Sequence, residues 1–232
     1  MTMKKRLECI YDKISDGIGM IDVGTDHGYL PVALARNGYA GNLFASDIGE
    51  GPLATARQHA EEAGVTDRIQ FLCCDGLALC PPDAVDCIAI AGMGGDTICG
   101  ILDRAEFCMN PRYTLVLQPM TRAEVLRYWL IYNEFCIMDE DLVEDGGILY
   151  SVFVARFGGQ SRLNDAELFT GSAALLAGHP LFPRMLEIQQ RRFRKVYHGL
   201  KSSGAGDEDG RLQLAQTICE QLEGMIAHDH GQ

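Results

Sequence analysis

The sequence predicts an α/β fold built on a mostly parallel sheet, followed by a separate helical segment. Two observations support this: five short apolar runs alternate with helix-length segments, and two further β-like runs then follow one another almost directly. Runs rich in Val, Ile, Leu and Phe are typical of strands buried on both faces of a parallel sheet. Strands that alternate with helices favour right-handed crossovers within one sheet.

These runs place the elements on the chain. Pro52 suits the first turn of one expected helix, and Gly64 suits its end. The expected parallel strands are residues 20–24, 42–46, 68–73, 86–91 and 113–117. The expected helices between them are residues 29–37, 52–63, 97–105 and 122–132.

The last two β-like runs, residues 135–142 and 148–157, are separated only by residues 143–147. So short a connection cannot hold a crossover helix, so we expect an antiparallel hairpin. Five βα units closed by a hairpin are typical of the Rossmann-like, seven-stranded sheet of class I methyltransferases. A dinucleotide-binding fold has a parallel sixth strand instead. Residues 1–157 are therefore expected to form one domain of the methyltransferase type.

Residues 158–232 are expected to form a second, helical domain. Residues 158–161 have the composition of a linker, and residues 202–210 form a polar, Gly-rich turn between two apolar seams. The seams are Leu186, Phe193 and Leu200 in an expected helix over 185–200, then Ala215, Ile218, Leu222 and Met225. This spacing predicts an antiparallel, coiled-coil-like helical hairpin.

Composition excludes several classes of protein. Of the 232 residues 47% are hydrophobic, which argues against disorder throughout, and no apolar run approaches the roughly 20 residues of a membrane span. No secretory signal follows the basic residues near the start. The nine cysteines form no Cys-x-x-Cys pair, so we expect reduced thiols, no metal site and a cytoplasmic protein. Four of them have apolar sequence neighbours and are expected to pack as small hydrophobes: Cys73, Cys87, Cys99 and Cys136.

Charge is distributed unevenly along the chain. The net charge of −12 argues against a uniformly basic nucleic-acid-binding face. In the segment 184–201, however, six cations oppose the single acidic residue Glu187, a local balance of +5. Such a run is either a phosphate-binding face or a solvated helix surface.

Ligands of an open parallel sheet bind beyond the carboxyl ends of its strands, so the residues after each strand are the site candidates. A Gly-rich turn follows the first strand, Asp47 ends the second, and Asp75 follows the third. A carboxylate can accept two ribose hydroxyls at once, and Asp75 suits an adenine amino group. Each feature alone is also an ordinary turn or cap. In this order they indicate a pocket for adenosine with a charged amino-acid tail, which is S-adenosylmethionine.

A nicotinamide dinucleotide is disfavoured, because the chain lacks Gly-x-Gly-x-x-Gly and Asp26 would repel a pyrophosphate. The residues expected to bind S-adenosylmethionine are Asp22, Gly24, Thr25, Asp26, Gly28, Asp47, Ile48, Asp75, Gly76, Ala91 and Gly92. The Gly-rich loop expected over 92–95 leaves room for a flat base, or is a turn with Met93 as core filler.

Four motifs resemble the bacterial tRNA (adenine(22)-N1)-methyltransferase family, and the resemblance extends from about Arg6 to Phe157. The motifs are Asp22-Val23-Gly24-Thr25-Asp26-His27-Gly28-Tyr29-Leu30-Pro31, Ile90-Ala91-Gly92-Met93-Gly94-Gly95, Leu117-Gln118-Pro119 and Arg127-Tyr128-Trp129-Leu130. The resemblance implies methyl transfer from S-adenosylmethionine to N1 of an adenine in the D-arm region of tRNA, and a helical C-terminal extension. Two departures are mild: Asp47 stands where Glu is expected, and Met120 where Asn is usual.

The acceptor site follows from this chemistry. Neutral adenine N1 carries an in-plane lone pair, so it needs placement rather than a base, and a paired adenine must first be flipped out. An oxygen that accepts from the amino group would favour the cationic transition state. Tyr29 is expected to stack on the base, whereas His27 either bonds it or is a satisfied loop histidine. The expected residues are Asp26, His27, Tyr29, Gly92, Met93, Gly94 and Gly95.

The expected partner is tRNA, bound by a monomer, with a weak homodimer as the alternative. Its expected contacts are Gln118, after the fifth strand, and Arg191, Arg192, Arg194 and Lys195 on the basic helix. Two other functions stay open: a class I methyltransferase acting on another RNA, a small molecule or a protein, and a non-catalytic RNA-binding or S-adenosylmethionine-sensing module. Detection of a methylated nucleoside after incubation with tRNA would separate them.

Overall fold

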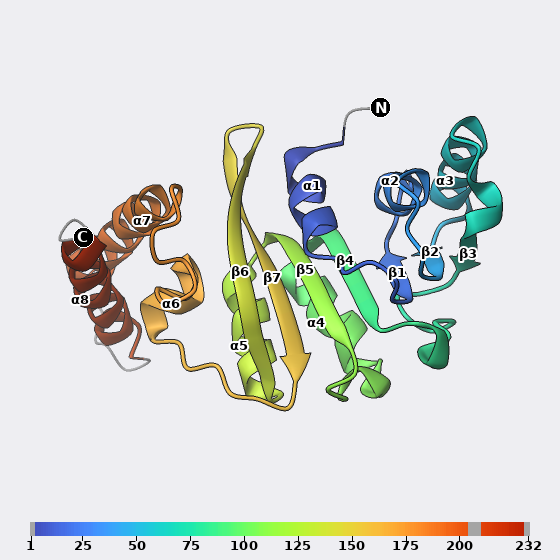
Figure 1. Cartoon of the computed structure of the whole chain (residues 1–232). Helices are drawn as coiled ribbons and strands as arrows, with labels where there is room; N and C mark the ends of the chain where they lie inside the picture. The colour runs from blue at the N-terminus through green and yellow to red at the C-terminus, as the bar shows by residue number, and fades with distance from the viewer. Residues whose placement is uncertain (1–2, 204–209, 230–232) are drawn as a thin grey trace. The chain divides into compact units, whose positions relative to one another are not determined.

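A seven-stranded sheet with the strand order β3-β2-β1-β4-β5-β7-β6 forms the first of two units (Figure 1). The computed structural model describes residues 3–203 and 210–229, and the units are Met1–Ser161 and Arg162–Gln232. Strands β1 to β5 are parallel, and β7 runs antiparallel to both β5 and β6. The strands are β1 (Met20–Val23), β2 (Leu43–Asp47), β3 (Ile69–Cys73), β4 (Cys87–Gly94), β5 (Thr114–Thr121), β6 (Phe135–Asp145) and β7 (Ile148–Phe157). The predicted fold class is confirmed.

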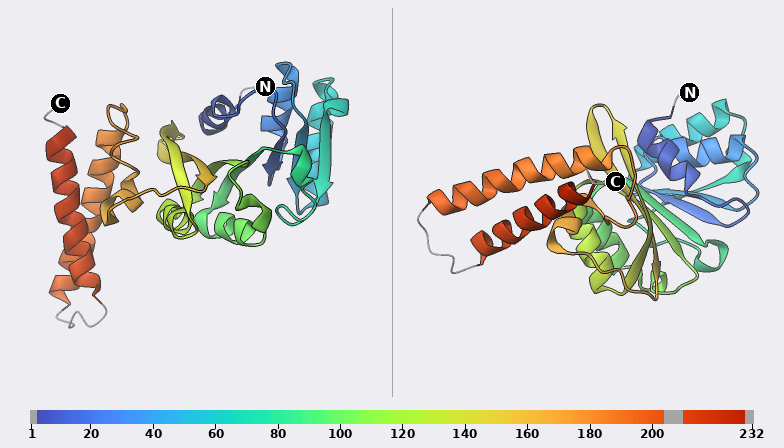
Figure 2. Two further views of the ribbon diagram at one scale, coloured as in Figure 1. Left: turned by 60° about the horizontal axis from the view of Figure 1, so that its bottom comes forward. Right: turned by 60° about the vertical axis from the view of Figure 1, so that its left-hand side comes forward.

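Helices cover both faces of this sheet, with α1, α2 and α3 on one face and α4 and α5 on the other (Figures 1 and 2). The chain moves outward from β1 to β3 and then returns to β4 on the other side of β1, so crossovers of one hand place the helices on opposite faces. The helices are α1 (Lys5–Asp12), α2 (Tyr29–Arg36), α3 (Glu50–Glu62), α4 (Gly95–Asp103) and α5 (Ala123–Tyr132), with short 3₁₀ turns at Thr66–Arg68, Pro82–Ala84 and Glu106–Cys108.

Several elements of the first unit differ from the sequence prediction. Strand β5 continues past residue 117 to Thr121, so Gln118 lies within the strand and not after it. Helix α1 was not predicted. Strand β4 continues to Gly94, so most of the expected Gly-rich loop is strand. Strand β6 extends to Asp145, which reduces the expected five-residue hairpin connection to Gly146 and Gly147, both at positive φ. Two positive-φ glycines make the tight turn whose twist matches that of an antiparallel pair.

The second unit contains α6 (Asp165–Thr170), α7 (Phe182–Ser202) and α8 (Arg211–Asp229). Helix α6 was not predicted; it begins with a capping box, in which Asn164 and Glu167 each bind the other's backbone N–H. Helices α7 and α8 pack along each other as an antiparallel pair, as predicted (Figure 2). The predicted seams are buried at Leu186, Phe193, Ala215, Ile218 and Leu222. Most of the predicted turn, residues 204–209, lies outside the described residues.

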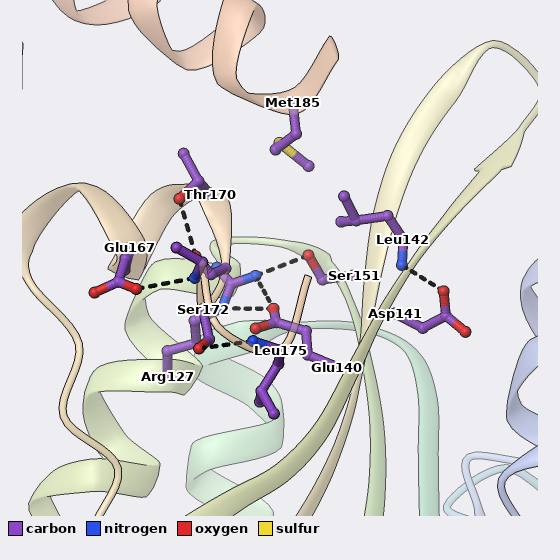
Figure 3. A network of polar contacts seen from close by, with 12 residues as sticks. Arg127, Glu140, Asp141, Leu142, Ser151, Glu167, Thr170, Ser172, Leu175 and Met185 are labelled. Carbon is purple, nitrogen blue, oxygen red and sulfur yellow. Dashed lines mark hydrogen bonds and ion pairs between the residues drawn. The ribbon is translucent and has the colours of Figure 1, made fainter. Parts of the chain in front are cut away.

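A buried ion pair joins α5 to the β-hairpin formed by β6 and β7 (Figure 3). The side chains of Arg127 and Glu140 are both 0% exposed, with Arg127 Nε 3.0 Å from Glu140 Oε1. Arg127 NH2 donates to Ser151 Oγ at 2.8 Å, and its guanidinium lies 4.6 Å from the centroid of the Phe153 ring. The sequence prediction used Arg127 only as part of a motif. Its structural role is to connect α5, β6 and β7.

Replacing Glu140 with Gln should destabilise the protein by about 3–5 kcal/mol, because the buried guanidinium would lose its counter-charge. Urea unfolding followed by the fluorescence of Trp129, the single tryptophan, measures this. The matched control is Glu106→Gln at an exposed carboxylate, expected to stay within about 0.5 kcal/mol of wild type. Equal, small effects of the two changes would contradict the structural role.

Candidate active site

The loop after β1 is held against β2. The backbone N–H groups of Gly24 and Thr25 both donate to the Ser46 carbonyl oxygen, at 2.8 and 2.9 Å. Gly28 has a φ of +70°, and a Cβ on it would lie 2.9 Å from the Ala56 Cβ on α3. Position 28 therefore needs glycine for its backbone conformation and for the close approach of α3.

Asp22 is a buried carboxyl group beneath this loop. It is 5% exposed and accepts a 2.6 Å hydrogen bond from Thr25 Oγ1. Its pKa is raised to about 6, chiefly by burial and also by the charge of Asp47, while the Thr25 hydrogen bond opposes the shift. At neutral pH the group is mostly ionised, so a cationic ligand group beside it would be stabilised.

Asp47 ends β2 with its carboxylate oriented by two backbone groups. Oδ1 accepts from the Gly49 N–H at 2.9 Å, and Oδ2 accepts from the Asp26 N–H at 3.3 Å. Each carboxylate oxygen has two lone pairs, so each can accept from a further donor. The neighbouring Ile48 side chain is 72% exposed and offers an apolar surface beside the carboxylate.

Asp75 forms an ion pair with Arg104 at the end of α4, with 3.0 Å between Arg104 NH2 and Asp75 Oδ1. Both side chains are more than half exposed, so the pair contributes at most about 1 kcal/mol. A donor on a ligand can therefore share or replace the Arg104 contact at little cost.

Two neighbouring cavities lie at the carboxyl ends of β1 and β4, where the strand order reverses. The larger, of about 430 Å³, is lined by Asp47, Ile48, Asp75, Gly76, Asp96 and Arg104 among others. The smaller, of about 280 Å³, is lined by Lys4, Arg6, Asp22, Thr25, Asp26, His27, Tyr29, Ala91 and Gly92 among others. Gly24 and Met93 line both, and a Cβ on Gly24 would overlap the Met93 methyl group. All predicted cofactor residues except Gly28 thus line one or both cavities.

Residues 92–94 form the end of β4, which has two register shifts against β5, and Gly95 begins α4. Gly94 has an ordinary φ of −69°, and a Cβ on it would lie 3.3 Å from Thr121 Oγ1. A Cβ on Gly95 would overlap the Arg122 carbonyl oxygen. The fold therefore requires glycine at 95, whereas at 94 it requires only a small adjustment of the Thr121 side chain. Neither residue is among those lining the two cavities.

Three rings gather beside the smaller cavity. The centroid of the Tyr29 ring lies 5.3 Å from that of His27 and 5.5 Å from that of His59, and the Tyr29 and His59 rings are stacked. His59 Nδ1 lies 2.8 Å from the His27 carbonyl oxygen, and His27 Nε2 lies 3.4 Å from Asp26 Oδ2. His27 Nδ1 is buried without a hydrogen-bond partner among the described residues. The sequence prediction missed His59, which no motif marks.

Gln118, predicted as a substrate contact, is 0% exposed and is not among the residues lining either cavity. Its amide nitrogen donates to the Pro119 carbonyl oxygen at 2.9 Å, and its amide oxygen accepts from Arg6 NH1 at 3.0 Å. Gln118 therefore contacts Arg6, which lines the smaller cavity, but does not line the cavity itself. The sequence prediction missed Arg6 and Lys4 as lining residues, because α1 itself was not predicted.

The basic residues of α7 are exposed but differ in their contacts. Arg194 forms an ion pair with Glu223 on α8, with 2.9 Å between NH2 and Oε1. Arg192 lies over the Phe169 and Phe193 rings. Arg191 and Lys195, four residues apart, project from one face of the helix. The four predicted cations thus do not form one uniform surface.

No group of three or more His, Cys, Asp or Glu side chains able to hold a metal ion occurs in the described ranges. None of the helices in the described part of the chain is long and apolar enough to cross a membrane. All nine cysteines lie in the described residues as free thiols. Cys87 and Cys99 are buried as expected, and burial raises the pKa of each to about 12. The expectation for Cys73 is wrong, because this residue at the end of β3 is exposed.

Comparisons with known proteins agree with this geometry. The tRNA (adenine(22)-N(1))-methyltransferase of Bacillus subtilis (strain 168) is 29% identical over 230 residues, covering 96% of this chain and 95% of that protein. The crystal structure of the B. subtilis M1A22 tRNA methyltransferase TrmK superposes with a TM-score of 0.85 at 27% identity, covering 97% of this chain and 99% of that one.

A second solved structure is that of Streptococcus pneumoniae Sp1610, a putative tRNA (m1A22) methyltransferase, in complex with S-adenosyl-L-methionine. It superposes with a TM-score of 0.81 at 28% identity, covering 97% of this chain and all of that one. The resemblance predicted from the four motifs is confirmed. A family model described as a methyltransferase domain matches residues 3–153, more than half of the chain. The protein therefore belongs to the methyltransferase domain family.

Proposed function

We propose that this protein is an enzyme that transfers a methyl group from S-adenosylmethionine to N1 of adenine 22 in tRNA. The observation that carries the proposal is the smaller cavity, because residues of two of the family-like motifs, 24–27 with 29–30 and 91–93, line it together. The match to the B. subtilis tRNA (adenine(22)-N(1))-methyltransferase over nearly the whole of both chains supports it. The monomeric state and the cytoplasmic location stay predictions.

The two cavities fit S-adenosylmethionine, which supplies the methyl group when bound. We assign the adenosine portion to the larger cavity, where Asp47 would accept from the ribose hydroxyls, Ile48 offers an apolar surface, and Asp75 would accept from the adenine amino group. The methionine portion is assigned to the smaller cavity, with the ionised Asp22 as the counter-charge of its ammonium group.

The acceptor adenine is assigned to the outer part of the smaller cavity, between the 26–29 loop and the end of β4. Its N1 lone pair needs no general base, so the task of Tyr29 is to stack on the ring and that of Asp26 or His27 is to accept from the amino group. The exposed Asp26 carboxylate would also stabilise the positive charge that methylation creates.

Incubation of the protein with labelled S-adenosylmethionine and unmodified tRNA should place the label in 1-methyladenosine, identified after digestion to nucleosides. A transcript with guanine at position 22 is the matched control and should stay unlabelled. A label in another nucleoside, or in the control transcript, would contradict the proposed acceptor. Absence of any label with tRNA would favour a small-molecule or protein substrate, or a module without catalysis.

Gly94→Val should lower methyl transfer about 100-fold. Gly94 does not line the smaller cavity itself, but it directly follows the lining residues Gly92 and Met93, so a side chain there would crowd the place where the proposed adenine leaves the cavity along the end of β4. Cofactor affinity and melting temperature should stay near wild type, since the backbone at 94 tolerates a Cβ. Gly95→Ala is the comparison, expected to lower the melting temperature because its Cβ would overlap the Arg122 carbonyl oxygen. A parallel loss of stability in Gly94→Val would assign Gly94 a structural role.

We propose that α7 holds the tRNA backbone through its exposed cations, chiefly Arg191 and Lys195. Each phosphate contact releases counterions, so affinity should fall with salt by about 0.9 log unit per log unit for each contact in duplex RNA. The double variant Arg191→Gln/Lys195→Gln should weaken tRNA binding and flatten that salt dependence, while helix content stays unchanged because Gln is also a good helix former. Filter binding over a range of salt concentrations measures this.

The matched control for α7 is Arg194→Gln, which removes a charge that Glu223 already neutralises, and it should change tRNA affinity less per charge. Wild-type affinity and salt dependence in the double variant would mean that α7 presents a solvated surface, and that the first unit binds the RNA.

A further inference from the structure

A basic side chain of the N-terminal helix lines the smaller cavity. Arg6 lies on α1, and its side chain is 14% exposed. It lines the cavity together with Asp22 and Gly92, and its NH1 lies 3.5 Å from where a Cβ on Gly92 would stand. Lys4 lines the same cavity but is exposed. Arg6 is therefore the basic side chain that this cavity holds away from solvent.

Two contacts orient the Arg6 guanidinium but use only part of its hydrogen-bond donors. NH1 donates to Gln118 Oε1 at 3.0 Å, and Nε lies 3.6 Å from Asp145 Oδ2 at the tip of the hairpin. The Gln118 amide is neutral, and the Asp145 contact is longer than a hydrogen bond. A guanidinium has five N–H donors, so donors are left for an anion inside the cavity.

The cavity thus presents both signs of charge. Asp22 supplies a buried carboxyl group beneath the β1 loop, and Arg6 supplies a guanidinium from α1. An α-amino acid is a zwitterion, with an ammonium and a carboxylate on one carbon atom. Its two charges match the two side chains, and Arg forms charge-assisted, often bidentate hydrogen bonds with carboxylates.

We infer that Arg6 binds the α-carboxylate of the methionine portion of S-adenosylmethionine, and so selects a cofactor with an intact amino-acid end. This rests on the proposed function, because that function supplies the cofactor. A phosphate of the RNA is the competing source of an anion. The carboxylate is favoured because Arg6 is mostly buried and shares its cavity with Asp22, Gly24 and Thr25.

Calorimetric titration without RNA tests the inference, with S-adenosylmethionine and its decarboxylated analogue as the two probes. Wild type should bind S-adenosylmethionine about 10- to 100-fold more tightly than the analogue, the range expected for a charge-assisted hydrogen bond. Arg6→Gln should remove most of that preference by weakening only the binding of S-adenosylmethionine. A purely structural role would weaken the binding of both probes equally.

Lys5→Gln is the matched control, because Lys5 lies on the same helix, is exposed and does not line the cavity. It should keep the wild-type preference, and Arg6→Lys should be intermediate because lysine lacks the planar fork. No preference in wild type, or an unchanged preference in Arg6→Gln, overturns the inference, as does a variant that loses tRNA affinity alone. Failure of wild type to bind S-adenosylmethionine at all would instead refute the proposed function.

Discussion

The pairing of β1 with β4 in the middle of the sheet is the constraint on which the rest of the site depends. The two strands are adjacent and parallel, yet the chain leaves β1 for α2 on one face and β4 for α4 on the other. Their carboxyl ends must therefore separate, and both cavities open there. The contact between Gly24 and Met93 spans this separation, and the bonds to Ser46 hold the β1 side in place.

The chemistry proposed for the site explains why no general base is needed. Because adenine N1 is already a nucleophile, the protein must position two ligands and balance charge, and the lining residues that do so come from turns, strand ends and helices. Two of the charged lining residues, Asp22 and Arg6, have largely buried side chains. Asp22 costs free energy in the free protein at neutral pH, and that cost falls when a cationic group lies beside it.

Much of the fold followed from local patterns, because the five parallel strands contain short apolar runs and the hairpin of β6 and β7 is marked by its brief connection. The errors arose where the pairing of neighbouring strands overrides the local preference of the residues for a loop or a turn. Glycines at 92 and 94 read as loop, yet β4 continues through them because β5 pairs with it. Val143 to Asp145 read as a turn, yet they pair with Ile148 to Tyr150 across two glycines.

The strand-end carboxylates of the site were predictable because topology brings the ends of β1, β2 and β3 together. Arg6 and His59 were not, since each acts through partners far along the chain. Arg6 meets Gln118, 112 residues away, and His59 meets the carbonyl group of His27, 32 residues away. Helix α1 has only eight residues, and the basic residues near the start of the chain were considered only as part of a possible secretory signal, so nothing suggested that they face a cavity.

The position of Met93 between the two cavities has a consequence for inhibitor design. A methionine side chain is unbranched and turns about three bonds, so the partition it forms is adjustable. A nucleoside fragment that fills the larger compartment alone leaves the partition in place, whereas a compound that links both compartments must displace the thioether. Affinity gained by linking two fragments would therefore depend on the linker replacing the contacts that Met93 makes with Gly24.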